Sequence, residues 1–155
     1  MKFDSFDKKI LALLQADASL STAEIAERVG LSTTPCWRRI QKLQAEGVIR
    51  GQVALLDRQA LNVGVTVFVA IRTNQHNAAW LARFAKAVVD FPEVMDCYRM
   101  AGEIDYLLRL ALPDIAAYDA FYKRLIERIE LTDVTSMFAM EEIKSTTALP
   151  LSFIE

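Results

Sequence analysis

The chain has 155 residues, of which 53% are hydrophobic and 25% are charged, and its formal net charge is −2 at pH 7. This much apolar material is enough for packed cores and excludes a disordered chain. No apolar run approaches the roughly 20 residues that a membrane helix needs, and the beginning, MKFDSFDKK, lacks the apolar core of a secretory signal. We therefore expect a soluble, cytoplasmic protein with no membrane partner.

Residues that carry catalytic, metal or redox chemistry are sparse. Cys36, Cys97 and the single histidine, His76, match no zinc-ligand spacing and no disulfide scaffold. We interpret both cysteines as core thiols rather than redox switches, and His76 as a surface loop residue. The carboxylates of Glu103 and Asp105 have no accompanying nucleophile, metal cluster or phosphate-binding glycine loop. We therefore expect no enzyme activity, no metal and no cofactor.

Charge is distributed unevenly along the chain. The first sixty residues contain nine basic and seven acidic residues, and the remainder contains nine basic and thirteen acidic residues. Between Ser32 and Arg50 the only acid is Glu46, and the bases are Arg38, Arg39, Lys42 and Arg50. A local basic patch on a mildly acidic protein suits contact with nucleic acid. It is equally compatible with an ordinary solvated helix face.

Helical periodicity predicts two helices before residue 30. In the first, apolar residues recur at helical spacing from Phe6 onward, and Asp4 or Ser5 is available as the N-cap. The second runs from about Thr22 to Val29. Ser21 and Glu24 have the spacing of a capping box at its start.

A third helix is predicted after Gly30, a residue that tolerates the left-handed conformation just past a helix end. Ser32 is the expected N-cap, and Pro35 falls in the first turn, where a missing N–H costs little. Three residues spaced i, i+4 and i+7 form the inward face: Cys36, Ile40 and Leu43. A short helix, a glycine turn and a longer helix with a polar face make a helix-turn-helix.

The outward residues of the third helix have the chemistry of a DNA-reading surface. Hydroxyls and free N–H groups at a helix start suit phosphate oxygens, and Arg38 can reach guanine edges or phosphates from the major groove. Trp37 can pack on the sugar-phosphate backbone or cover the edge of the helical bundle. The outward residues are Thr33, Thr34, Trp37, Arg38, Gln41 and Lys42. A plain three-helix bundle with this face in solvent is the alternative.

The second half has the pattern βαββαβ, the ferredoxin-like plan. Strands are expected within 63–73, 94–100, 105–112 and 134–143, and helices over 78–91 and after the N-cap Asp114. The inward residues of the first of these helices are Leu81, Phe84, Ala85 and Val88. Helices on one face of a four-stranded sheet leave the other face bare, so we expect at least a dimer.

The predicted fold class is therefore α+β, with two domains. Residues 1–50 form a winged helix-turn-helix domain, 51–62 a hinge strand or linker, and 63–155 the ferredoxin-like domain. The apolar run from Val48 to Asp57 is expected to pair as a short wing or hinge strand.

Over nearly its full length the chain resembles the Lrp/AsnC family of transcription regulators. The resemblance rests on DKKILALLQADA, AEIAERVGLSTTPCWRRIQKLQAEGVI, PEVMDCYRMAGEIDYLLRL and FAMEEIKSTTALPL, in that order. It implies an N-terminal DNA-binding domain, a C-terminal effector domain that binds amino acids at interfaces, and homodimers that assemble to octamers. The chain is most similar to a branch that regulates cysteine breakdown, which implies cysteine or another small amino acid as effector.

The resemblance also assigns site residues. The DNA-reading segment of the family matches Thr22 to Gln41, which adds Thr22, Ser32, Pro35 and Arg39 to the predicted contacts with double-stranded DNA. The effector-site turn matches AGEID, where Gly102 follows Ala101 and allows close backbone approach, and Asp105 pairs with the ammonium group of a ligand. Thr135 and Ser136 are expected to offer hydroxyls to the same ligand.

These features together predict a dimeric, amino-acid-responsive transcription regulator. One alternative is an architectural DNA-binding protein with little sequence preference, but the modest positive charge of the first half argues against binding by electrostatics alone. A small-molecule enzyme built on the ferredoxin-like domain is a second alternative, and the lack of a catalytic constellation counts against it.

Overall fold

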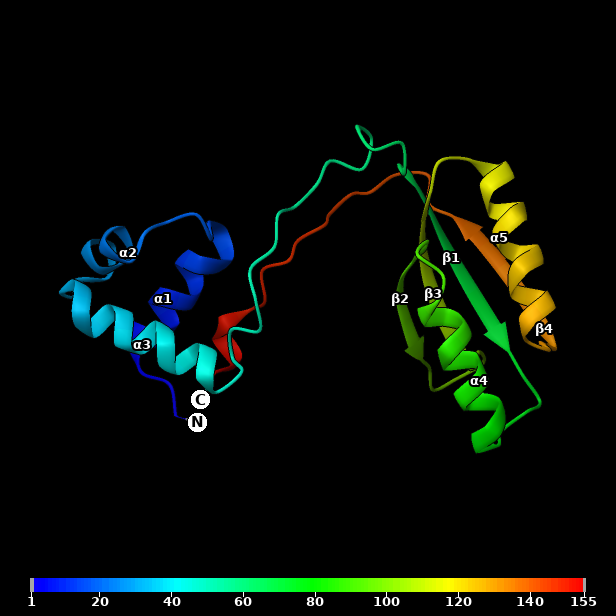
Figure 1. Ribbon diagram of the computed structural model, residues 1–155, viewed down its shortest axis with the longest axis horizontal. Coiled ribbons are helices and arrows are strands. Elements are labelled where there is room, and N and C mark those ends of the chain that lie inside the picture. The colour runs from blue at the N-terminus through cyan, green and yellow to red at the C-terminus, as the bar shows by residue number, and fades with distance from the viewer. Residues whose placement is uncertain (1, 155) are drawn as a thin grey trace. The chain divides into compact units, whose positions relative to one another are not determined.

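A computed structural model describes residues 2–154, and the chain divides into two compact units (Figure 1). The first unit contains the chain up to Leu55 and again from Lys144 onward, and the second contains Leu56–Ile143. The predicted second domain includes everything after residue 62. The structure instead groups the C-terminal segment with the first unit, because its backbone and side chains contact the first helix.

The first unit is a bundle of three helices, α1 (Ser5–Ala16), α2 (Thr22–Val29) and α3 (Thr33–Ala45). Asp4, rather than Ser5, is the N-cap of α1, and its carboxylate accepts hydrogen bonds from the N–H groups of Phe6 and Asp7. The core is formed by Ile10, Leu11, Ile25, Ala26, Val29, Cys36, Ile40 and Leu43. The predicted helices and their inward faces are therefore confirmed.

The expected wing or hinge strand is not formed within residues 48–57. Val53, Leu55 and Leu56 in this segment are exposed. A strand needs a hydrogen-bonded partner, and all described strands of the chain pair with one another in the second unit. The strand prediction was wrong here because an apolar run does not by itself supply a partner.

The second unit is an antiparallel sheet with two helices, and its topology confirms the predicted βαββαβ order. The elements are β1 (Val65–Arg72), α4 (Ala78–Val89), β2 (Val94–Arg99), β3 (Tyr106–Leu112), α5 (Ile115–Arg128) and β4 (Asp133–Phe138). The sheet order is β2-β3-β1-β4 (Figure 1). Because β1 and β3 are central, β2 and β4 form the two edges.

The core of the second unit lies between one face of the sheet and both helices. From the sheet it takes Val67, Val69 and Ile71 of β1 and every second residue of β3. Trp80 stacks on Phe84 with ring centroids 5.0 Å apart. The indole N–H of Trp80 donates to the Glu130 carbonyl at 3.1 Å, so this buried ring has no unsatisfied donor.

Three details of the second unit differ from the prediction. Trp80 and Ala87 are buried on α4, whereas Leu81 and Ala85 are exposed, because the buried stripe lies about one residue away from the predicted one. β4 ends at Phe138 rather than at residue 143. Cys97 is exposed rather than buried, because it lies on the edge strand β2.

The face of the sheet opposite the helices is open within the described chain. Half-buried Phe68 and Leu107 lie on it, together with exposed Tyr98 and Met137. Arg109 also lies there and donates from Nε to Asp96 Oδ2 at 2.6 Å. Among residues 2–154 no helix is long and apolar enough to cross a bilayer.

Phe121 tests the core of the second unit. Its side chain is fully buried and meets Phe91 edge to face at 5.1 Å. We expect Phe121→Ala to lower the free energy of unfolding of this unit by about 3–5 kcal/mol, through lost burial and a new cavity. Urea titration followed by Trp80 fluorescence in a Trp37→Phe background measures it. The control Val89→Ala, at a residue 83% exposed, should change stability by less than about 0.5 kcal/mol. Equal losses in the two variants would contradict this core.

Candidate nucleic-acid interface and effector site

The turn between α2 and α3 has the geometry expected of a helix-turn-helix. Ser21 and Glu24 form the capping box at the start of α2. Gly30 is left-handed, with φ 78°, and its N–H bonds back to the end of α2. A side chain at this φ would be strained, so glycine allows α3 to follow α2 after a single short turn.

Helix α3 separates the predicted site residues from the core. Cys36, Ile40 and Leu43 are buried, and burial raises the pKa of the Cys36 thiol. The opposite surface exposes Ser32, Thr33, Thr34, Pro35, Trp37, Arg38, Gln41 and Lys42. Thr22, at the start of α2, is half-buried, and Trp37 remains 51% exposed. The structure therefore presents most of the predicted DNA contacts on one helix.

Ser32 keeps its hydroxyl free at the start of α3. It occupies the N-cap position in an extended conformation, yet its side chain makes no capping hydrogen bond. The first N–H groups of a helix have no partner within the helix. This helix start therefore offers a hydroxyl and backbone donors of the kind that bind phosphate oxygens.

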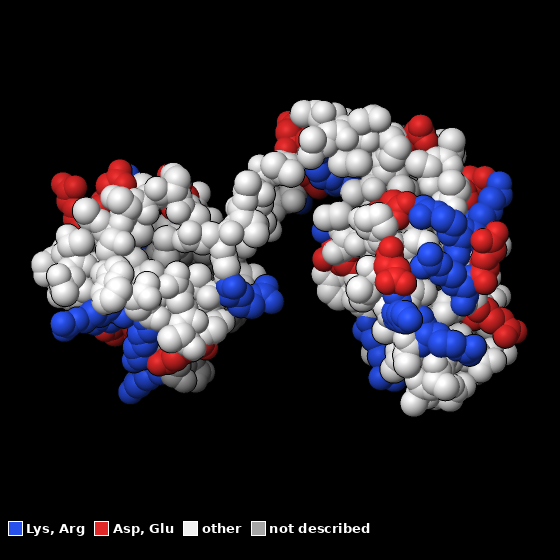
Figure 2. Space-filling model, viewed as in Figure 1, with Lys and Arg blue, Asp and Glu red and all other residues white. Residues whose placement is uncertain are grey.

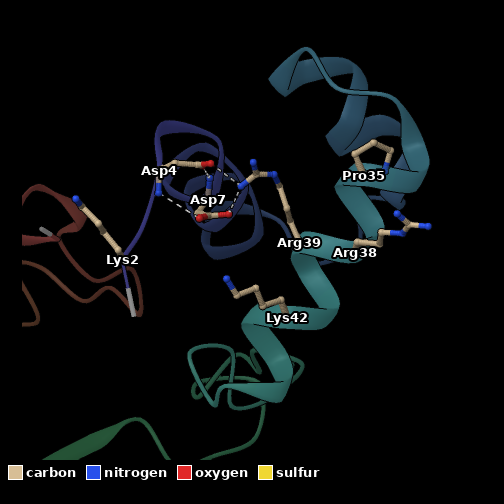
Figure 3. Close-up of a pocket in the computed structure, with 7 residues that line it drawn as sticks. All are labelled: Lys2, Asp4, Asp7, Pro35, Arg38, Arg39 and Lys42. Carbon is tan, nitrogen blue, oxygen red and sulfur yellow. Dashed lines mark hydrogen bonds and ion pairs between the residues drawn. The ribbon is translucent and has the colours of Figure 1, made fainter.

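Arg39 differs from the other predicted DNA contacts because it turns toward α1. Its Nη1 lies 2.8 Å from Asp4 Oδ2 and 2.7 Å from Asp7 Oδ1 (Figure 3). The N–H of Asp7 and then the Arg39 guanidinium hold the pKa of Asp4 below its ordinary value, and the bond to Asp7 raises the pKa of Arg39. Arg39 is thus an anchor between α3 and α1, and Arg38 points away from both acids (Figure 3).

Beside this anchor the surface has a hollow with a volume of about 440 Å³. The hollow is lined by Lys2, Asp4, Asp7, Pro35, Arg38, Arg39 and Lys42 (Figure 3). Because Arg39 pairs with both acids, three further cations, Lys2, Arg38 and Lys42, give the hollow a positive excess. Lys2 was not predicted as part of the site, since a single lysine outside any helical or capping pattern carries no signal.

The charge of the first unit contrasts with that of the second. Basic side chains lie along the α3 side of the first unit, whereas basic and acidic side chains alternate over the second unit (Figure 2). In the second unit Lys123, Arg124 and Arg128 pair with acids on α5, in the loop before β2 and at the end of α4. On α3, Arg39 pairs with Asp4 and Asp7 and Lys42 lies 3.9 Å from Glu46, which leaves Arg38 as the cation of this helix without an acid partner among residues 2–154.

The predicted effector turn lies between β2 and β3, and Asp105 is tied into the end of the sheet. Gly102 has φ 133°, a conformation that favours glycine. The N–H of Asp105 donates to the Ile71 carbonyl at 2.9 Å, and Asp105 Oδ2 accepts the N–H of buried Thr73 at 2.8 Å. The carboxylate thus has one structural partner, and its remaining acceptor capacity is open to a ligand.

Several polar groups gather at this end of the sheet. Arg72 lies 3.8 Å from Glu103, and Thr132 donates from its N–H to the Arg72 carbonyl and accepts the N–H of Asn74. The ends of β1, β3 and β4 therefore meet beside Asp105.

Thr135 and Ser136 do not share a face of the sheet. Ser136 pairs with Val69 on the helix-covered face, and its hydroxyl is hydrogen-bonded to Tyr118 of α5. Thr135 pairs with Ala70 on the open face and is exposed. The two hydroxyls cannot both line one site on the open face, because successive strand residues point to opposite sides.

Comparison with known proteins gives matches over both units. Residues 3–50 match the family model described as winged helix-turn-helix DNA-binding, and residues 66–149 match the model of the Lrp/AsnC ligand binding domain. These matches confirm the predicted fold class and the predicted resemblance.

Three individual proteins are similar over almost the whole chain. The glutamate uptake regulatory protein of Zymomonas mobilis is 52% identical over 97% of this chain and 92% of its own length. The DNA-binding transcriptional activator DecR of Escherichia coli (strain K12) is 50% identical over 96% of this chain and 98% of its own. A transcriptional regulator from Neisseria meningitidis, solved in complex with L-Met, is 36% identical with TM-score 0.93, covering 97% of this chain and 98% of that chain.

Arg39→Met tests the anchor. We expect a lower melting temperature of the first unit at pH 7, because Asp4 and Asp7 lose their counter-ion. Since the folded-state pKa of Asp4 is lowered, its contribution to stability is present above the ordinary value of 3.8 and is lost as the pH falls through the folded-state pKa. The deficit of the variant should therefore shrink as the pH falls below the ordinary value of 3.8.

Calorimetry of the full chain measures this deficit, with Arg38→Met as the matched control on the same helix. Arg38 is exposed and has no acid partner among residues 2–154. Equal melting temperatures of the two variants at every pH would contradict the anchor.

Proposed function

Because the chain belongs to the Lrp/AsnC family of DNA-binding transcriptional regulators with an amino-acid-responsive ligand-binding domain, we propose which surfaces perform these two tasks. Helix α3 is the recognition helix, the hollow beside it receives DNA phosphates at Lys2 and Lys42, and the turn at Gly102 and Asp105 binds the effector. The observation that carries the proposal is the division of α3 into a buried apolar face and an exposed face of hydroxyls and cations.

Each part of the DNA surface has its own task in this proposal. Arg38 extends from the exposed side of α3 toward base edges, where an arginine can make bidentate bonds to guanine. Ser32, Thr33 and Thr34 contact backbone phosphates at the helix start. Arg39 contributes indirectly, since its ion pairs with Asp4 and Asp7 hold α3 against α1.

A homodimer is proposed to form through the open face of the sheet. Phe68, Leu107, Tyr98 and Met137 leave apolar surface there that a second copy would cover. Two-fold symmetry would place two copies of α3 on half-sites about 34 Å, or a multiple of that spacing, apart. Assembly of such dimers to an octamer remains the expectation for this family.

The effector is proposed to be a small amino acid that binds beside Asp105. Its ammonium group would pair with the Asp105 carboxylate, and its carboxylate would approach the backbone at Ala101 and Gly102. Thr135 is on the open face and can contribute a hydroxyl, whereas Ser136 is engaged by Tyr118. The effector changes DNA binding if it binds one assembly of the protein more tightly than another.

Cysteine is the first effector to test and methionine the second. Cysteine follows from the resemblance to the branch that regulates cysteine breakdown, and the N. meningitidis regulator was solved with L-Met. Relatives of almost equal identity carry different names, one of them a glutamate uptake regulatory protein. The choice therefore depends on titration of the protein itself.

Arg38→Ala tests the recognition helix. We expect a loss of about 1–3 kcal/mol in binding to the specific site, with a much smaller loss on unrelated DNA, because a base contact carries sequence information. Fluorescence anisotropy at one fixed salt concentration measures both affinities. Arg83→Ala, at an exposed arginine on α4 of the second unit, is the control. Unchanged specific affinity in Arg38→Ala would remove this residue from the interface.

Asp105→Ala and Asp105→Asn together test the effector turn. Both remove the negative charge, but the asparagine side chain retains an oxygen that can accept the Thr73 N–H. We expect both variants to bind DNA and to lose the response to the amino acid, while only Asp105→Ala also lowers the stability of the second unit. Retention of the response in Asp105→Asn would place the ammonium site elsewhere.

A further inference from the structure

The last described residues of the chain pack onto the three-helix unit. Leu151–Phe153 form a short 3₁₀ helix that lies beside the helices of the first unit (Figure 1). Leu151 and Ile154 are half-buried and pack against the apolar core of this unit, whereas Phe153 between them is 82% exposed. This alternation of half-buried and exposed neighbours indicates a specific packing site, called the apolar seat, because a loosely attached segment would expose its residues alike.

Two side chains of α1 hold the backbone of the same segment. Lys8 Nζ donates to the Ile154 carbonyl at 2.7 Å. The side-chain amide of Gln15 bonds to both backbone polar groups of Leu149. Its Nε2 donates to the Leu149 carbonyl at 3.2 Å, and its Oε1 accepts the Leu149 N–H at 2.6 Å. Lys8 and Gln15 are seven positions apart and so lie on one face of α1. The hydrogen bonds of Gln15 hold the segment at Leu149, and the hydrogen bond of Lys8 together with the apolar seat holds it at Ile154.

The stretch before this segment is anchored far less. Residues 139–150 are exposed and contain no helix or strand. This stretch follows β4, the strand of the second unit that carries Thr135. The chain therefore leaves the sheet, runs without helix or strand and next forms a regular element at Leu151–Phe153, beside α1.

We propose that residues 149–154, the C-terminal clasp, are an integral part of the DNA-binding unit and form an interaction surface with α1. The clasp would hold α1 in place, and Asp4 and Asp7, at the start of α1, anchor Arg39 of the recognition helix. Its effect on DNA affinity rests on the function proposed above, whereas its effect on α1 does not. The DNA-binding unit then requires residues from both ends of the chain.

Two aspartate variants of the full chain test the clasp. Ile154→Asp places a charge in the apolar seat, and Phe153→Asp places the same charge on the neighbouring exposed residue. Hydrogen exchange followed by mass spectrometry reports on the amides of α1. We expect exchange to accelerate about tenfold or more in Ile154→Asp, because loss of packing raises the population of the locally opened state. In Phe153→Asp the exchange should match that of the unchanged chain.

Gln15→Ala provides a second test that leaves the apolar seat intact, for the case that Ile154→Asp does not fold. It removes both contacts to Leu149 and should accelerate exchange in α1 more than Gln44→Ala, at an exposed residue of α3.

Specific DNA affinity should fall in Ile154→Asp and stay unchanged in Phe153→Asp. Equal exchange in each variant and its control would overturn the clasp without affecting the role of Arg38.

Discussion

The burial of one face of α3 is the constraint on which the proposed DNA-binding surface depends. Once Cys36, Ile40 and Leu43 enter the core, the period of the helix places Arg38, Gln41 and Lys42 outside. Arg39 lies at the border between these faces and is held by two carboxylates at the start of α1. Packing thus sets the direction of α3, the proposed recognition helix, and one ion-pair cluster fixes it to α1.

The second unit depends on a similar division between its two faces. Both helices cover the face of the sheet that carries Val67 and Val69, so apolar residues of the opposite face stay uncovered within residues 2–154. The proposed effector turn lies at the end of the central strands, where Asp105 bonds to the backbone of Ile71 and Thr73. A ligand at this position would contact the strand ends directly, and β4 continues into the segment that returns to α1.

Local patterns were sufficient to predict most elements, but contacts between distant residues were not predictable from them. Capping residues and apolar spacing predicted α1, α2 and α3, since these signals lie within one or two helical turns. Asp7, a partner of Arg39, lies 32 positions before it in the sequence. Thr73, whose N–H donates to the Asp105 carboxylate, lies 32 positions before Asp105. The seat of Ile154 on α1 joins the two ends of the chain. Single-sequence periodicity contains no information on such pairs.

The most direct test of a ligand-responsive, sequence-specific regulator is a DNA titration of the purified protein. DNA from upstream of its own gene would be compared with unrelated DNA of equal length, at fixed salt, with and without cysteine, methionine or leucine. We predict tighter binding to the upstream DNA and a shift in that affinity with one amino acid. Equal binding to both DNAs, unchanged by every amino acid, would contradict this prediction and favour an architectural DNA-binding protein whose affinity depends mainly on salt.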